Sequence, residues 1–519
     1  MNIKRAKQEI INTVRAYLEK DELGEYTIPS IRQRPILLMG PPGIGKTQIM
    51  EQIAGECDLA LVAYTITHHT RQSAIGLPFI VEKVYDGQTR SVTEYTMSEI
   101  IAAVYDRMEA SGKKEGILFI DEINCVSETL APTMLQFLQG KTFGNQAVPK
   151  GWIIVAAGNP PEYNRSVRDF DVVTLDRVKV IPVEADFEVW KEYAWQAGIH
   201  GSILAYLEIR RDQFYRMETA VDGKRFVTAR GWQDLSELIC SYERLGLTVD
   251  REVTSQYLQH PATAKDFANY LELYYRYQND YQVDEILSGT IRPGVLNRLK
   301  FAPFDERVEV VGLLLAKLAQ IFRDAYETDR FTDALFAVLK EYRKRAAEDH
   351  GPGDNGEDRM SGAGLLKRIR KEHEQQIEER IRAGQNAKEL RLSGRRLSVT
   401  MEAYEKLLES RETGEDRSAA GSFPVLQEAF AQETAAREKV MEEAMEKLEY
   451  AFDFMEAAFG ESQEMVMFIT ELSVNPYAAA FLRENDCARY YMYNKNLLFE
   501  DRDARIREQL DQIRDLQIT

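Results

Sequence analysis

Residues 40–47 have the composition of a loop that binds phosphate groups. The segment reads Gly40-Pro41-Pro42-Gly43-Ile44-Gly45-Lys46-Thr47. It fits the pattern G-x-x-x-x-G-K-[ST] without a mismatch. Glycines let the backbone approach anionic phosphates, because a Cβ would block the approach and disfavour positive φ angles. Lys46 would place a positive charge at the β- and γ-phosphates, and the Thr47 hydroxyl would be a ligand of Mg²⁺.

A second group of polar residues follows an apolar run. Residues 116–124 read G-I-L-F-I-D-E-I-N, a buried strand that ends in Asp121 and Glu122. Asp121 can hold Mg²⁺ through its water shell, and Glu122 can polarise a water molecule against the γ-phosphate. A solvated acidic pair at a strand end is the alternative. The strand position after the phosphate loop favours the catalytic interpretation.

Asn159 follows a further apolar run, residues 152–157. An amide at the carboxyl end of a neighbouring strand can hydrogen-bond the attacking water or the γ-phosphate, because ligands bind at that edge of open α/β sheets. We therefore expect Asn159 to complete the site.

The surrounding pattern predicts the elements that position these residues. Short apolar runs at residues 35–39, 59–67, 116–120, 152–157 and 178–183 read as strands of a parallel sheet. Helical patterns cover residues 1–20, 48–56, 97–110 and 130–138. Two alternating runs around Asp86-Gly87, over residues 80–95, predict a β-hairpin between the second and third strands. A second, smaller hairpin is expected within residues 140–151.

Composition restricts the class of protein. The chain has 519 residues, too many for one ordinary core, with 44% hydrophobic and 29% charged residues, which is typical of globular domains. We find no run of about 18 apolar residues and no signal-peptide pattern at the N-terminus, so we expect no membrane span and a cytoplasmic location. The net charge of −18 argues against a sequence-independent nucleic-acid binder.

Cysteine and histidine usage does not indicate a zinc site. Cys57, Cys125, Cys240 and Cys487 lack metal-ligand spacing and are expected to be free thiols in a reducing compartment. The pair His68-His69 could suggest a metal, but no cysteine or carboxylate cluster accompanies it.

Over residues 35–245 the chain resembles the AAA+ ATPases. The phosphate loop, the D-E-I-N strand, Asn159 and the hairpin carry this resemblance, which is nearest to the MoxR group, in the clade with an insert in the second helix. The resemblance implies an α/β fold, in which a P-loop parallel sheet with flanking helices is followed by an all-α lid and an α-helical C-terminal region. It also implies ATP and Mg²⁺ as ligands and a homo-oligomeric ring, usually a hexamer, with ATP at each interface. Asn159 would be sensor 1.

Two arginine roles follow from the same resemblance. Arg177, in T-L-D-R-V, would be the arginine finger; Val178 replaces the phenylalanine usual in the family, and Arg165 and Arg168 are rivals. Arg230, in V-T-A-R-G-W-Q-D-L, would be sensor 2 at the start of a lid helix. The alternative for Arg230 is a surface arginine near a helix N-cap.

The sequence predicts four regions: the nucleotide-binding domain at 1–184, the helical lid at 185–300, a helical extension at 301–350 and a helical accessory region at 351–519. Tyrosines spaced along residues 270–281 could stack on bases, but a packed helix face is favoured. A polar linker is expected at residues 350–356, and loose chain at 411–422. Between them, residues 365–396 read as one charged helix, and residues 486–519 are again helical and charged.

A helix over residues 426–459 has one apolar side rich in methionine and phenylalanine, for which core packing is favoured over partner docking. The side consists of Met441, Met445, Leu448, Phe452, Met455 and Phe459.

These observations favour a MoxR-like ATPase that remodels or activates a protein partner. In resembling systems that partner often carries a von Willebrand factor A domain, whose D-x-S-x-S motif is absent from this chain. Two alternatives stay open. One is a nucleotide-dependent assembly scaffold with little turnover, and the other is a nucleic-acid motor with a basic pore.

Overall fold

The computed structural model describes residues 1–68, 72, 74, 76–143, 146–163, 170–220, 223–348, 361–382, 387–411 and 419–495. The chain separates into two compact units, each built from two stretches of sequence. The first contains Met1–Val189 and Arg368–Val399, and the second contains Trp190–Lys367 and Thr400–Thr519.

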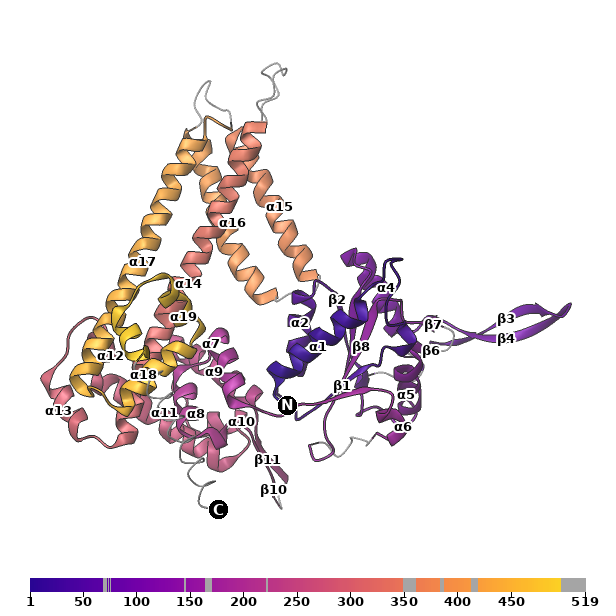
Figure 1. Ribbon diagram of the computed structural model, residues 1–519, viewed down its shortest axis with the longest axis horizontal. Helices are drawn as coiled ribbons and strands as arrows, with labels where there is room; N and C mark the ends of the chain where they lie inside the picture. Colours follow the sequence, from indigo (N-terminus) through magenta and orange to yellow (C-terminus); the bar gives the residue numbers. More distant parts are fainter. Residues whose placement is uncertain are drawn as a thin grey trace, which may run out of the picture. The chain divides into compact units, whose positions relative to one another are not determined.

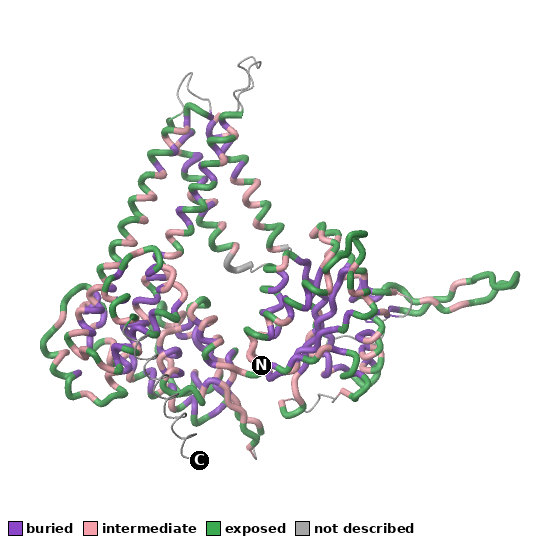
Figure 2. The backbone as a smooth tube through the Cα atoms, in the orientation of Figure 1, coloured by how far each residue is buried: buried purple, intermediate pink, exposed green. Residues whose placement is uncertain are grey.

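The first unit is built on a parallel sheet with the order β2-β5-β8-β1-β9 among the described residues. The strands are β1 (Ile36–Met39), β2 (Ala60–Thr65), β5 (Gly116–Asp121), β8 (Trp152–Gly158) and β9 (Lys179–Pro182). Each of the five apolar runs predicted as a strand therefore forms one. The central strands β5 and β8 are buried on both faces, as their continuous apolar sequences require (Figure 2).

Helices cover both faces of this sheet (Figure 1). Helices α1 (Ile3–Leu18) and α2 (Lys46–Glu56) pack on one face, and α4 (Glu99–Ser111) and α5 (Ala131–Gly140) pack on the other. Side chains alternate between the two cores: Leu37 lies with α4 and α5, whereas Ile36 and Leu38 lie with α1 and α2. The expected α/β fold class, followed by a largely helical region, is confirmed.

The hairpin expected between the second and third strands is also present. β3 (Pro78–Tyr85) pairs antiparallel with β4 (Gln88–Tyr95) and projects from the sheet (Figure 1). Its turn residues Asp86 and Gly87 have φ angles of 53° and 74°, as a D-G turn requires. The smaller hairpin pairs β6 (Thr142–Phe143) with β7 (Gln146–Ala147).

The second unit is mostly helical. Its helices are α7 (Phe187–Ala197), which begins just before it, α8 (Gly201–Ile209), α9 (Ala229–Leu245), α10 (Arg251–Tyr257), α11 (Pro261–Tyr281), α12 (Val283–Ile286), α13 (Pro293–Phe301), α14 (Phe304–Glu348), α17 (Phe423–Ala458), α18 (Gln463–Val474) and α19 (Pro476–Glu484). The tyrosine spacing along α11 reflects packing, because Tyr270, Tyr274 and Tyr281 are buried.

The lid is not purely helical, contrary to expectation. β10 (Arg216–Ala220) and β11 (Gly223–Val227) form an antiparallel hairpin before α9. The signal was present in the sequence, because two short runs flank Asp222-Gly223, the same turn dipeptide that marks the first hairpin.

The expected single helix over residues 365–396 is wrong. Two helices are present, α15 (Gly362–Arg382) and α16 (Ala387–Arg411), and the sequence between them contains glycine and asparagine, which are poor helix formers. Gly394 allows close packing here, since a Cβ on it would lie 2.4 Å from the Ile377 Cδ1 atom.

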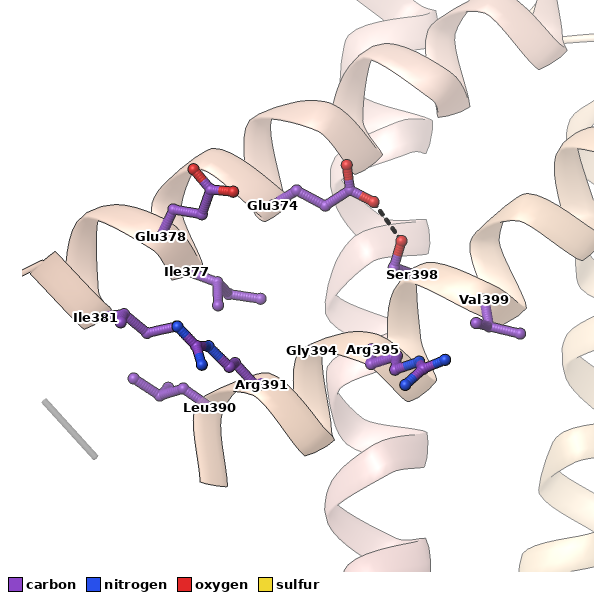
Figure 3. Close-up of a pocket in the computed structure, with 10 residues that line it drawn as sticks. All are labelled: Glu374, Ile377, Glu378, Ile381, Leu390, Arg391, Gly394, Arg395, Ser398 and Val399. Atoms are coloured by element: carbon purple, nitrogen blue, oxygen red, sulfur yellow. Dashed lines mark hydrogen bonds between the residues drawn. The ribbon is translucent and has the colours of Figure 1, made fainter. Parts of the chain in front are cut away.

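A pocket of about 540 Å³ lies between α15 and α16, with Glu374 and Arg391 among its lining residues (Figure 3).

The methionine- and phenylalanine-rich side of α17 is part of a core. Leu448, Phe452 and Met455 are fully buried, and Met441, Met445 and Phe459 are half-buried. Helix α17 packs along α14, and α14 also contacts α18 and α19. Core packing is therefore confirmed for this side, and it is not a free docking surface. The expected linker at 350–356 lies outside the described residues, as do most of 411–422 and residues 496–519.

The region after residue 400 belongs to the same compact unit as the lid. Lys191 of α7 is 4% exposed, and its Nζ atom lies 2.5 Å from Glu208 of α8 and 2.5 Å from Glu471 of α18. Burial alone would lower the pKa of Lys191, but the two carboxylates raise it. The ammonium thus stays charged and joins the lid to α18.

Lys191→Met is expected to lower the free energy of unfolding by about 3–5 kcal/mol, because two buried carboxylates would lose their shared cation. Lys439→Met is the control, since Lys439 forms an exposed pair with Glu443 at 3.8 Å and should change stability by less than about 0.5 kcal/mol. Chemical denaturation of the full chain measures both. Equal, small effects would show that α18 is not energetically coupled to the lid.

Within the described chain, no single helix has the length and apolar composition to cross a membrane. The bent pair Gln463–Val474 with Pro476–Glu484 passes that test by length and composition when taken together.

Candidate functional site

The phosphate loop connects β1 to α2 at the carboxyl edge of the sheet. Gly43 and Gly45 have φ angles of 76° and 88°, a backbone region that residues with a Cβ rarely adopt. Helix α2 begins at Lys46 without a side-chain cap, and the N-terminus of a helix is a favourable position for an anion. The loop therefore has the backbone geometry that its sequence predicted.

Lys46 is held inside this loop and is 8% exposed. Its Nζ atom donates to the carbonyl oxygens of Gly40 at 2.6 Å and Pro41 at 2.9 Å, and to Oδ1 of Asn159 at 2.8 Å. These contacts fix the positive charge between the loop and the end of β8. They also bring together two residues that the sequence assigned to one site.

Thr47 and Asp121 meet across the sheet edge. The Thr47 hydroxyl donates to Oδ2 of Asp121 at 2.8 Å. A hydroxyl and a carboxylate are hard oxygen ligands of the kind Mg²⁺ prefers, and Mg²⁺ in nucleotide sites uses few protein ligands. The residues thus fit Mg²⁺ bound with a nucleoside triphosphate.

The described residues contain no cluster of three or more histidine, cysteine, aspartate or glutamate side chains that could hold a metal, and His69 lies outside them.

Glu122 has an unusual backbone conformation. Its φ angle is 56°, in the left-handed region that non-glycine residues seldom adopt. Its amide donates to Oδ1 of Asp121 at 2.9 Å, and the next amide, of Ile123, donates to the carbonyl of Ala157 on β8 at 2.9 Å. Backbone strain of this kind concentrates at functional sites, where the surrounding structure enforces it.

Asn124 belongs to the site, although no role for it is predicted from the sequence. It is 3% exposed, and its Nδ2 atom donates to the carbonyl of Asn159 at 2.8 Å. The main-chain N–H of Asn159 in turn donates to Oδ1 of Asn124 at 3.2 Å. The signal was the final letter of D-E-I-N, a polar residue in an otherwise apolar segment.

The arginine-finger candidate is exposed and contacts helix α5. Arg177 is exposed and follows α6 (Val172–Leu175), and its guanidinium donates to the side chain of Gln139 on α5. An exposed arginine is what a role at a neighbour's site would require. The rivals Arg165 and Arg168 lie outside the described residues.

Arg230 belongs to the second unit. It is exposed in the first turn of α9, whose N-cap residue Thr228 accepts a hydrogen bond from the amide of Gly231 at 3.2 Å. Its assignment as sensor 2 stays a prediction.

Comparisons with known proteins found a family match for part of the first unit. Residues 36–174 match the family model "ATPase family associated with various cellular activities (AAA)". No curated protein matches the chain. Among solved structures, a mutant of RuvB from Thermotoga maritima is 16% identical, with a TM-score of 0.24. The match covers 38% of this chain and about half (53%) of that one. Such a TM-score does not establish a shared fold.

Proposed function

We propose, from the AAA domain at residues 36–174, that the chain is an ATP hydrolase that acts as a ring and remodels a protein partner. The observation that carries hydrolysis is the convergence of one complete residue set at the carboxyl edge of the sheet. Lys46 contacts Asn159, and Thr47 contacts Asp121, with Glu122 next in the chain.

Each residue has a distinct task in this proposal. Lys46 and the N–H groups at the start of α2 bind the phosphates, and Thr47 with Asp121 would hold Mg²⁺, which neutralises charge on the transferred phosphoryl group. Glu122 orients and polarises the attacking water, and Asn159 contacts that water or the γ-phosphate. Arg177 would complete the site of a neighbouring copy, in a ring that we propose to be a hexamer, as is usual among resembling proteins.

A MoxR-like role is the finer proposal. The net charge of −18 suits a protein client better than nucleic acid. We propose that the client carries a von Willebrand factor A domain, and that the complex acts in the cytoplasm, in keeping with the four free cysteines.

Steady-state phosphate release tests the enzymatic part. The parent protein should hydrolyse ATP only with Mg²⁺, and Lys46→Ala should lose activity because the phosphates lose their buried cation. Parent turnover equal to that of Lys46→Ala would refute hydrolysis and favour the assembly scaffold. The client is then sought by capture on Glu122→Gln with ATP, using a purified von Willebrand factor A domain as bait and ADP as control.

A further inference from the structure

We propose that Asn124 is a positioning residue: it holds the main chain of Asn159, so that the Asn159 side-chain amide lies at the γ-phosphate end of the site. This role rests on the proposed function. Asn124 follows strand β5, and it would hold in place the residue that follows strand β8. Asn124 acts through Asn159 and is not itself in contact with the reacting atoms.

The hydrogen bonds define the orientation of both amides. Lys46 can only donate, so the Asn159 atom at 2.8 Å from its ammonium must be the oxygen Oδ1. The main-chain carbonyl of Asn159 can only accept, so Asn124 must present its Nδ2 atom to it. The main-chain N–H of Asn159 can only donate, so Asn124 must present its Oδ1 atom to that group. The Asn159 NH₂ group is thereby left as the end of the side chain turned away from Lys46.

An asparagine is required at position 124 on two grounds. Its side chain must donate and accept at once, which neither leucine nor aspartate can do. The space is also limited, because a Cβ on Gly158 would lie 2.8 Å from Oδ1 of Asn124 and 3.0 Å from the sulfur of Met39. A glutamine at position 124, or any residue larger than glycine at position 158, would displace the pair.

The pair links the two strand ends that perform the chemistry. Asn124 follows Asp121 and Glu122 after β5, while Asn159 follows β8 and bonds Lys46 of the phosphate loop. Two hydrogen bonds from Asn124 therefore join the end of β5 to the end of β8. In the folded protein these bonds are protected from competition with water, since Asn124 is buried.

Asn124→Leu tests the proposal in the full-length protein. It is nearly isosteric but removes both hydrogen bonds, and we expect kcat to fall by roughly 10–100-fold, the range for losing a group that orients a functional side chain. The affinity for MgADP should change by less than about threefold, because Lys46 and the loop backbone stay intact. Gly158→Ala should likewise lower kcat with little change in that affinity, because the added methyl group would displace Asn124.

A double-mutant cycle separates positioning from folding. If Asn124 acts through Asn159, adding Asn124→Leu to Asn159→Ala should lower kcat little further. Asn475→Leu is the control, because Asn475 is also buried and accepts from two amides, at 2.9 Å from Tyr477 and 3.2 Å from Ala478. It should lower thermal stability without changing kcat.

Nucleotide discrimination gives a readout that does not need turnover. Asn124→Leu should narrow the affinity difference between ADP and a non-hydrolysable ATP analogue, because the γ-phosphate loses an oriented donor. The proposal would be overturned if Asn124→Leu changed neither kcat nor the ratio of the affinities for ADP and the ATP analogue. It would also be overturned if the fold losses in kcat of the two single mutants multiplied in the double mutant. A parent without turnover would refute hydrolysis instead, and the discrimination measurement would still decide the role of Asn124.

Discussion

Glu122→Gln is expected to bind MgATP nearly as tightly as the parent but to hydrolyse it on the order of 10²–10⁴-fold more slowly. The amide keeps the size of the side chain and one carbonyl oxygen, but it cannot accept a proton from the attacking water. Lys46→Ala should behave differently, because it removes the buried ammonium between Gly40, Pro41 and Asn159 and so weakens nucleotide binding itself. Fluorescent-nucleotide titration and phosphate release measure the two effects.

Glu109→Gln is the matched control for Glu122→Gln. Glu109 is exposed on α4, so neutralising it makes the same change in net charge without touching the site. Its binding and turnover should equal those of the parent. An equal loss of nucleotide binding in Glu122→Gln and Lys46→Ala would contradict the separate role assigned to Glu122.

The features predicted well from sequence are those encoded by contiguous residues. The phosphate loop, the strand ending at Asp121 and the hairpin around Asp86-Gly87 each combine a local pattern with a local conformation. The hairpin before α9 has the same turn signal in Asp222-Gly223, but it interrupts a region in which helical patterns dominate. Local patterns thus account for the sheet and for most of the candidate site.

Other features depend on contacts between distant segments, which no local pattern encodes. The Asn124–Asn159 pair requires β5 and β8 to be neighbours in a known register, and these strands are separated along the chain by α5 and the hairpin β6–β7. The burial of Lys191 against Glu471 joins residues 280 positions apart. For the same reason, the apolar side of α17 could be identified from sequence, whereas the α14 surface that covers it could not.

Arg177→Ala should reduce turnover on the order of 10³–10⁵-fold while leaving nucleotide affinity largely intact, as expected for an arginine that stabilises transition-state charge from a neighbouring copy. The exposed position of Arg177, with its guanidinium on Gln139 and not on its own phosphate loop, agrees with action in trans. Arg32→Ala is the control, because Arg32 is exposed just before β1, at the opposite end of that strand from the phosphate loop.

Mixing subunits distinguishes an arginine that acts in trans from one that acts within its own subunit. Arg177→Ala subunits keep an intact phosphate loop, and Lys46→Ala subunits keep an intact arginine, so a mixed ring contains interfaces at which one of each rebuilds a complete site. Turnover should therefore appear on mixing two inactive proteins, with a maximum at intermediate ratios. If Arg177→Ala is not rescued at any ratio but Arg165→Ala is, the finger belongs to the segment after Asn159, and Arg177 serves its own subunit.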